Sequence, residues 1–214
     1  MTDNAVMPKH QDEETNLEHL NSHDFQILLT GTGKKVLEIC SELGSITKIL
    51  SERDCDVTII EVKNMLSKRI EKFADRVLVR DLETSNLKEI VGAEKYDIIL
   101  ISDILSRLKE PTLFLKQIRE FLVHNGHIVF SVPNITNAIN RIKFLNGEFK
   151  YAENGLIDKN HLCFFTLDSI LSMIDTSGYS ITQLFRVKQE IQLSSTDIKQ
   201  YRSEERRVGK ECRL

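Results

Sequence analysis

Short apolar runs rich in β-branched residues alternate with helix-like segments, and this alternation constrains the fold more than any other feature of the sequence. Continuous runs predict strands at 35–40, 57–62, 77–79, 97–101 and 127–132, with a last candidate at 179–187. Apolar residues at helical spacing predict helices at 45–53, 65–73, 111–122 and 167–176, and a weaker one within 17–28. Strands that alternate with crossover helices favour a doubly wound, mostly parallel α/β sheet covered on both faces.

The chain of 214 residues is long enough for one domain, which we place at 17–187 with an insertion or lid at 133–165. Residues 1–16 are polar, and we expect them to form a disordered tail. Residues 188–201 carry only a weak apolar alternation, so we interpret them as a truncated C-terminal segment and expect the last strand of the sheet to be missing. Residues 202–212 resemble a translated sequencing adapter, so 202–214 is interpreted as an artefactual tail; a natural charged tail is the alternative.

Composition excludes several classes of function. The longest apolar stretches are far shorter than the roughly 18 residues of a membrane span, and no secretory signal is visible at the N-terminus. The four cysteines form no CxxC motif, so we expect reduced thiols, no metal site and a cytoplasmic location. A net charge of −3 makes nucleic acid an unlikely partner, although basic and aromatic residues mix at 141–151, where an amphipathic lid helix is an equal explanation.

Acidic residues follow the predicted strands, at the edge where open α/β sheets bind ligands. Glu38 lies in the first strand, Glu61 closes the second, Asp81 follows the third and Asp103 the fourth. A carboxylate after the second strand can accept hydrogen bonds from a ribose diol, and one after the third can accept from an exocyclic amine. Because these loops hold acids and no phosphate-cradling glycine run or lysine, the pattern favours a cationic adenosine ligand over a pyrophosphate.

Six motifs, in order and spacing, resemble the class I S-adenosylmethionine-dependent methyltransferases. They are VLEICSELG (36–44), VTIIEV (57–62), RDLE (80–83), YDIILISDILSRLKEP (96–111), HNGHIVFSVPN (124–134) and GEFKYAENGLIDKNHLCFFT (147–166). The last is similar to an H-L-R-F-F-T-like segment of a bacterial and archaeal subgroup often linked to cell-surface glycan pathways. The resemblance implies a Rossmann-like methyltransferase fold, S-adenosyl-L-methionine as cofactor, and a small-molecule or glycan-type acceptor.

The resemblance also implies which residues form the site. Those that would bind the cofactor are Glu38, Cys40, Gly44, Glu61, Val62, Asp81, Leu82 and Ser102. In the insertion, His161 is the candidate catalytic base for an acceptor hydroxyl, although it can equally fix the loop by hydrogen bonding. Asp103 either caps the following helix or lines the pocket. The oligomeric state is left open.

The sequence also departs from the family pattern at several of these positions. Cys40 and Glu42 occupy the places of the first two loop glycines, and only Gly44 remains. Ser106 and Arg107 stand where the subgroup often has a Glu-His pair, and Cys163 replaces the Arg of the H-L-R-F-F-T segment. These changes motivate an alternative to the enzyme, namely a degenerate, non-catalytic methyltransferase-like binding module.

Overall fold

The computed structural model describes residues 20–39, 44–61, 71–80, 82, 87–153 and 155–187. Five parallel strands form one sheet in the order β3-β2-β1-β4-β5. They are β1 (Lys35–Ile39), β2 (Asp56–Glu61), β3 (Arg76–Val79), β4 (Tyr96–Ser102) and β5 (Leu122–Ser131). The strand order reverses between β1 and β4, so the predicted doubly wound α/β fold is confirmed.

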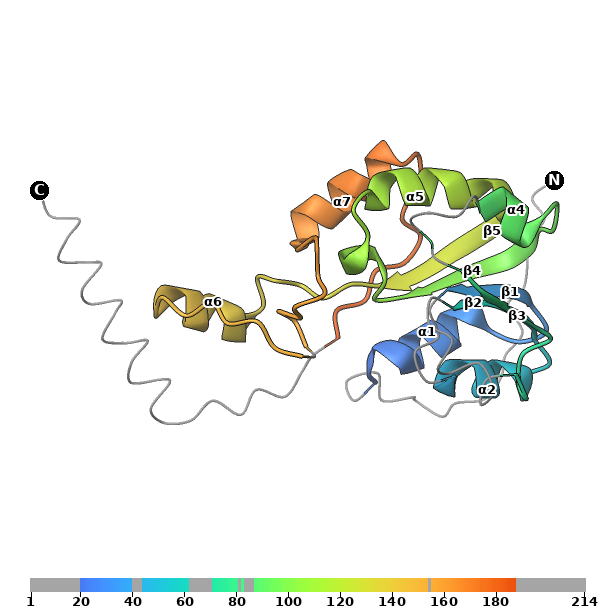
Figure 1. The fold of residues 1–214 in the computed structure, drawn as a ribbon, viewed down its shortest axis with the longest axis horizontal. Coiled ribbons are helices and arrows are strands. Elements are labelled where there is room, and N and C mark those ends of the chain that lie inside the picture. The colour runs from blue at the N-terminus through green and yellow to red at the C-terminus, as the bar shows by residue number, and fades with distance from the viewer. Residues whose placement is uncertain are drawn as a thin grey trace, which may run out of the picture.

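Helices cover both faces of this sheet (Figure 1). One face carries α1 (Ser22–Thr30) and α2 (Ser45–Ser51), and the other carries α4 (Leu87–Val91), α5 (Pro111–Ile118) and α7 (Leu167–Thr176). Successive β1 residues serve opposite faces: Val36 packs in the α1/α2 core, whereas Leu37 and Ile39 pack in the α4/α5/α7 core. Continuous apolar strands are therefore explained by burial on both sides.

Local signals in the sequence set the ends of several helices. Pro111 is the first residue of α5, where its missing N–H costs nothing. Asn21 caps α1 and Thr166 caps α7, each accepting a hydrogen bond from a backbone N–H of the first turn. A further helix, α6 (Ala138–Leu145), is capped by Asn137 and projects away from the sheet (Figure 1). It lies inside the predicted 133–165 insertion.

The predicted strand at 179–187 is wrong. This segment has no regular secondary structure, and residues 180–187 are exposed. Side-chain contacts hold its two ends: Tyr179 Oη donates to the Leu115 carbonyl oxygen at 2.8 Å, and Phe185 stacks on Phe25 with ring centroids 4.6 Å apart. An alternating pattern becomes a strand only when it forms backbone hydrogen bonds with a neighbouring strand, and within the described residues β5 pairs with β4.

Two other boundaries differ from expectation. The β5 strand starts five residues before the predicted 127–132 run, because it continues through an irregularity at Asn125, whose φ is 66°, and Gly126. Residues 65–70 of the predicted 65–73 helix lie outside the described residues, as do the predicted tails at 1–16, 188–201 and 202–214; residues 71–73 form a turn. Among the described helices, none has both the length and the apolar character that crossing a bilayer requires.

Candidate functional site

Glu38 places a carboxyl group inside the protein near the carboxyl end of β1. Its side chain is fully buried, and Thr47 Oγ1 of α2 donates to its Oε2 at 2.6 Å. Its Oε1 is buried and has no hydrogen-bond partner among the described residues. Burial raises the pKa of Glu38 to about 7; the Thr47 hydrogen bond opposes this and the negative charge of Glu61 adds to it. An orphaned buried acceptor of this kind is suited to a ligand that brings a donor or a positive charge.

Glu61 is the last residue of β2, on the strand beside β1. It is 5% exposed, and its backbone pairs with Val79 of β3. Because parallel strands end at one edge of the sheet, Glu38 and Glu61 occupy the same rim, and their charges interact. As the sequence predicted, Glu38 lies within the first strand and Glu61 closes the second.

Gly44 precedes α2 with a φ of 68°. That left-handed conformation favours glycine, so the one glycine retained in the loop stands where the backbone requires it. The predicted site residues Cys40, Val62 and Asp81 lie outside the described residues. Leu82 is buried in the apolar core on the α4/α5/α7 face.

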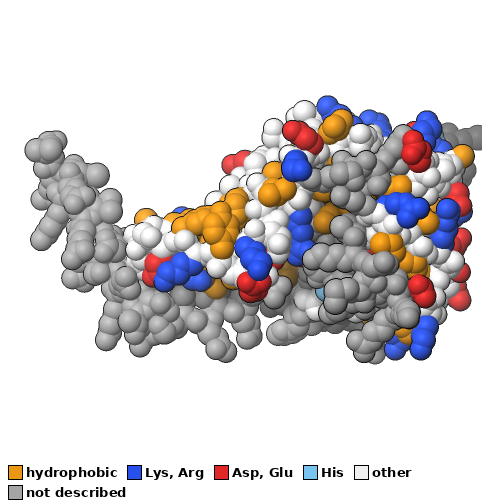
Figure 2. All heavy atoms as spheres, in the orientation of Figure 1, with side chains coloured by type: hydrophobic (Ala, Val, Ile, Leu, Met, Phe, Trp, Pro, Cys, Tyr) orange, Lys and Arg blue, Asp and Glu red, His pale blue; other side chains and the backbone are white. Residues whose placement is uncertain are grey.

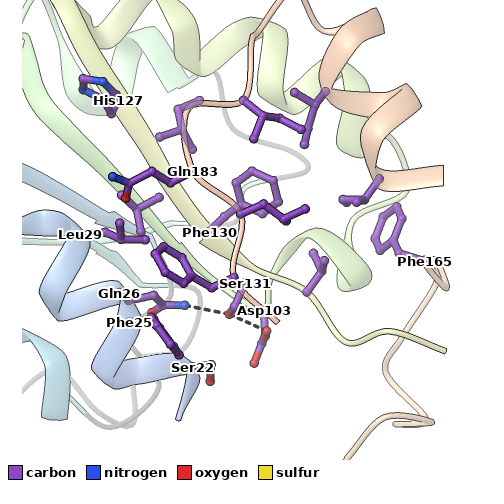
Figure 3. Close-up of a pocket in the computed structure, with 18 of the residues that line it drawn as sticks. Ser22, Phe25, Gln26, Leu29, Asp103, His127, Phe130, Ser131, Phe165 and Gln183 are labelled. Carbon is purple, nitrogen blue, oxygen red and sulfur yellow. Dashed lines mark hydrogen bonds between the residues drawn. The ribbon is translucent and has the colours of Figure 1, made fainter. Parts of the chain in front are cut away.

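A chain of directed hydrogen bonds joins the ends of β4 and β5 to α1 (Figure 3). Ser102 Oγ donates to Gln26 Oε1 at 2.8 Å, and Gln26 Nε2 donates to Ser131 Oγ at 2.7 Å. Ser131 Oγ in turn donates to Asp103 Oδ1 at 2.7 Å. Sequence reasoning missed Gln26 and Ser131. The signal was present, because Gln26 is a polar residue between Phe25 and Ile27 on the buried side of α1.

The structure places His161 in the segment that follows α6. It is 8% exposed, its ring lies 6.2 Å from that of Phe164, and its Nδ1 is buried without a hydrogen-bond partner among the described residues. The Asp158 side chain is buried. Its carboxylate accepts hydrogen bonds from the backbone N–H and the side-chain amide of Asn160 at 2.7 and 2.8 Å, and it faces the Arg107 guanidinium at 3.7 Å. These hydrogen bonds and the Arg107 and His161 charges outweigh burial and hold the pKa of Asp158 below its usual range.

An open cleft of about 1740 Å³ brings part of the predicted site together. It runs along β5 and is lined by residues of α1, of both strand ends and of the insertion, among them Gln26, Asp103, Ser131, Asp158, His161 and Phe165. Figure 3 shows the side chains of Gln26, Ser131 and Asp103 meeting at one end of it. Glu38 and Glu61 do not line this cleft; they lie at the neighbouring strand ends β1 and β2. The site therefore consists of two buried acids near the carboxyl ends of β1 and β2 and an open cleft at β4 and β5.

Residues 14–184 match the family model described as a methyltransferase domain. The chain therefore belongs to this methyltransferase family, the class I S-adenosylmethionine-dependent enzymes, and its cofactor is S-adenosylmethionine. No curated protein matches the sequence.

Three solved structures show the same fold at low sequence identity. A methyltransferase from Mesorhizobium loti superposes with a TM-score of 0.57 at 13% identity, covering 88% of this chain and 93% of that one. One from Aquifex aeolicus gives 0.57 at 13% identity, covering 82% and 88%. One from Thermotoga maritima, described as a possible histamine N-methyltransferase, gives 0.56 at 17% identity, covering 75% and 70%.

The residues on the rim fit this cofactor. Its ribose offers two hydroxyl donors and its methionine end carries positive charge, whereas Glu61 offers acceptors and Glu38 has a buried acceptor oxygen without a described partner. The donor set of the ligand and the acceptor set of the rim are complementary.

Proposed function

We propose that this protein transfers a methyl group from S-adenosylmethionine to a small-molecule or glycan-type acceptor. The observation that carries the proposal is the pair of buried acids at adjacent strand ends, Glu38 and Glu61, next to a cleft large enough for an acceptor. When bound, the cofactor supplies a methyl group already activated by a positively charged sulfur. The protein then has mainly to bind, orient and exclude water.

Each predicted residue has a role in this proposal. Glu61 accepts from the ribose hydroxyls, and Glu38 faces the cationic end of the cofactor with its free acceptor oxygen. Gly44 lets the loop approach the ligand, and the remaining wall is formed by Cys40, Val62, Asp81, Leu82 and Ser102. Because the Ser102 hydroxyl already donates to Gln26, Ser102 contributes to the wall through its backbone.

The insertion carries an aromatic cluster that lies outside the lining of the cleft and could bind a ligand with apolar faces. Phe144 and Phe149 stack at 5.7 Å, and Tyr151 and Phe164 meet Phe149 edge-on at 5.3 and 6.1 Å. Figure 2 shows hydrophobic side chains gathered on the lobe that contains α6, with lysines and arginines beside them. Aromatic faces of this kind bind the apolar faces of rings while polar edges remain in water. His161, in the same segment, is the candidate base if the acceptor atom is a hydroxyl.

Calorimetric titration with S-adenosylhomocysteine tests the proposal. We expect binding that weakens by about 30-fold or more in Glu61→Ala, since two hydrogen bonds to a charged group are lost. Glu52→Ala is the matched control, because Glu52 is an exposed acid whose ion-pair partner among the described residues is Lys48, one helical turn away. Equal affinity in wild type and Glu61→Ala contradicts the proposal.

A second titration separates the enzyme from the degenerate binding module. The double substitution Cys40→Gly/Glu42→Gly restores the two loop glycines of the family pattern. If the protein is an enzyme adapted to its own loop, the double substitution should change its affinity for S-adenosylhomocysteine little. If it is a module that has lost cofactor binding, the substitution should increase that affinity strongly.

A further inference from the structure

Asp103 lines the cleft with a left-handed backbone, as Asn125 also does at another position along β5. It follows β4 directly and has a φ of 51°, in the left-handed region that costs a residue with a Cβ about 1 kcal/mol or more. It neither caps a helix nor forms an ion pair that the structure shows. Strain of this kind persists where surrounding contacts hold it in place, and it is concentrated at functional sites.

The contacts that hold Asp103 form the hydrogen-bond chain from α1. Ser102 donates its proton to Gln26, whose amide then donates to Ser131, and Ser131 donates its only proton to Asp103 Oδ1. Every donor in the chain is directed toward the carboxylate, so the chain ends on an acceptor. Gln26 is 2% exposed, which shields the chain from competing water.

The other oxygen of Asp103, Oδ2, has no hydrogen-bond partner among the described residues, and Asp103 lines the cleft. The closest cation along the chain, Arg107, faces Asp158 instead. The carboxylate is thus fixed on one side and available to a ligand on the other, so the charge it would complement is positive.

We propose that Asp103 receives the amino group of the acceptor and that Gln26 is the positioning residue that fixes Asp103. The proposal rests on the proposed function and names its substrate class: a small molecule or sugar that bears an amine. The bound ammonium group first loses one proton to water, which frees the nitrogen lone pair. In the transfer, that lone pair forms the new bond to the methyl carbon while the carbon–sulfur bond breaks, its electron pair remaining on sulfur. Positive charge thereby moves from sulfur to nitrogen beside Asp103 Oδ2, and the ammonium product later loses its proton to water.

This placement makes Asp103 a transition-state contact. A fixed carboxylate gains attraction to the nitrogen as the charge arrives there, so it stabilises the transition state more than the neutral amine. The orientation of the Asp103 carboxylate matters for the same reason, and the buried hydrogen bonds that run from Gln26 through Ser131 fix that orientation.

The test measures binding of benzylamine and its neutral counterpart benzyl alcohol to protein saturated with S-adenosylhomocysteine, at neutral pH. We expect the wild type to bind benzylamine at least about tenfold more tightly than benzyl alcohol, from one charge-assisted hydrogen bond. Asp103→Asn keeps the size and can still accept from Ser131, and it should remove this preference. Asp175→Asn, an exposed residue of α7, should keep it.

Gln26→Met tests the positioning role. It should reduce the preference for the amine by about threefold to tenfold while leaving the affinity for S-adenosylhomocysteine unchanged; a merely structural role would lower every affinity together. Ser131→Ala, which removes the last link of the chain, gives the same test if Gln26→Met does not fold.

The outcomes are distinguishable. Equal affinity for the two probes in the wild type, or a preference that survives in Asp103→Asn, overturns the amine proposal and leaves the cofactor site standing. Failure of the wild type to bind S-adenosylhomocysteine overturns the proposed function itself.

Discussion

The backbone N–H of Cys163 donates a hydrogen bond to the carbonyl oxygen of Ser106 at 2.9 Å, and the N–H of Leu162 donates to the same oxygen at 2.7 Å. Ser106 and Cys163 are both positions where the sequence departs from the family pattern, although 57 residues separate them. Arg107, another such position, faces Asp158 of the same insertion. These three departures are therefore neighbours, and they join the turn after β4 to the insertion.

Ser106→Ala should leave the protein as stable as the wild type or stabilise it by about 1 kcal/mol. The Ser106 side chain is fully buried, and its Oγ has no hydrogen-bond partner among the described residues. The desolvation cost of burying this hydroxyl is therefore not offset by a hydrogen bond. Its carbonyl contacts to the insertion are kept in the variant. Thermal unfolding measures the difference, and a clear loss of stability would show that the hydroxyl has a partner.

Asp158→Ala should destabilise the protein by about 2 kcal/mol, because two Asn160 hydrogen bonds and the Arg107 contact all end on this buried carboxylate. The pKa of Asp158 is held below its usual range. Its contribution is therefore present above the unfolded pKa and is lost as the pH falls through the folded one. Urea unfolding at neutral and acidic pH measures both effects. Asp175→Ala is the exposed control; if it costs as much, the assigned contacts are not the cause.

Glu38→Gln should make the protein more stable than the wild type at pH 8. The carboxyl has its usual pKa of 4.5 in the unfolded chain and about 7 in the folded one, a difference of about 3 kcal/mol as an upper bound. Between these values the unfolded chain releases a proton that the folded one retains, so wild-type stability falls from about pH 4.5 to pH 7 and is level above it. Glutamine does not ionise, so the variant lacks this pH-dependent loss of stability.

The measurement for Glu38 is urea unfolding of both proteins at pH 5 and pH 8. Their difference in free energy should be larger at pH 8. The same variant should bind S-adenosylhomocysteine more weakly, because the ammonium group at the amino-acid end of this ligand loses a buried counter-charge. A pH-independent difference would contradict the assigned ionisation.

Gly126→Ala should destabilise the protein by about 1–3 kcal/mol. An added Cβ would lie 3.1 Å from the carbonyl oxygens of Tyr96 and Asp97 in β4, which cannot move without disturbing the sheet. The matched variant is Asn125→Gly in the same turn, where the φ of 66° favours glycine and the stability should hold or rise. Calorimetric unfolding should therefore show a loss of stability in Gly126→Ala alone, and a loss in both variants would indicate that the irregularity in β5 is held by the Asn125 side chain.

The sequence was sufficient for the features that depend on local pattern. Apolar runs located the five strands, and the sequence pattern placed Glu38 within the first strand and Glu61 at the end of the second; their binding roles stay predictions. The sequence was insufficient for features that depend on contacts between segments far apart in the chain. The role of Gln26 depends on hydroxyls at 102 and 131, and no local pattern joins these three residues. The segment 179–187 has several apolar residues, but a strand also needs a neighbouring strand with which its backbone can form hydrogen bonds.

All four strand pairings of the sheet are parallel, so none closes through a short turn. Even the nearest partners, Thr58 of β2 and Arg76 of β3, lie 18 residues apart in the sequence, and Val36 of the central strand β1 pairs with Ile98 of β4 far along the chain. Such distant closures make folding slow. During synthesis, β1 leaves the ribosome well before β4, and until β4 follows, the apolar edge of β1 has no partner on that side. Expression at low temperature, with a slower ribosome and weaker hydrophobic association, should therefore increase the yield of folded protein.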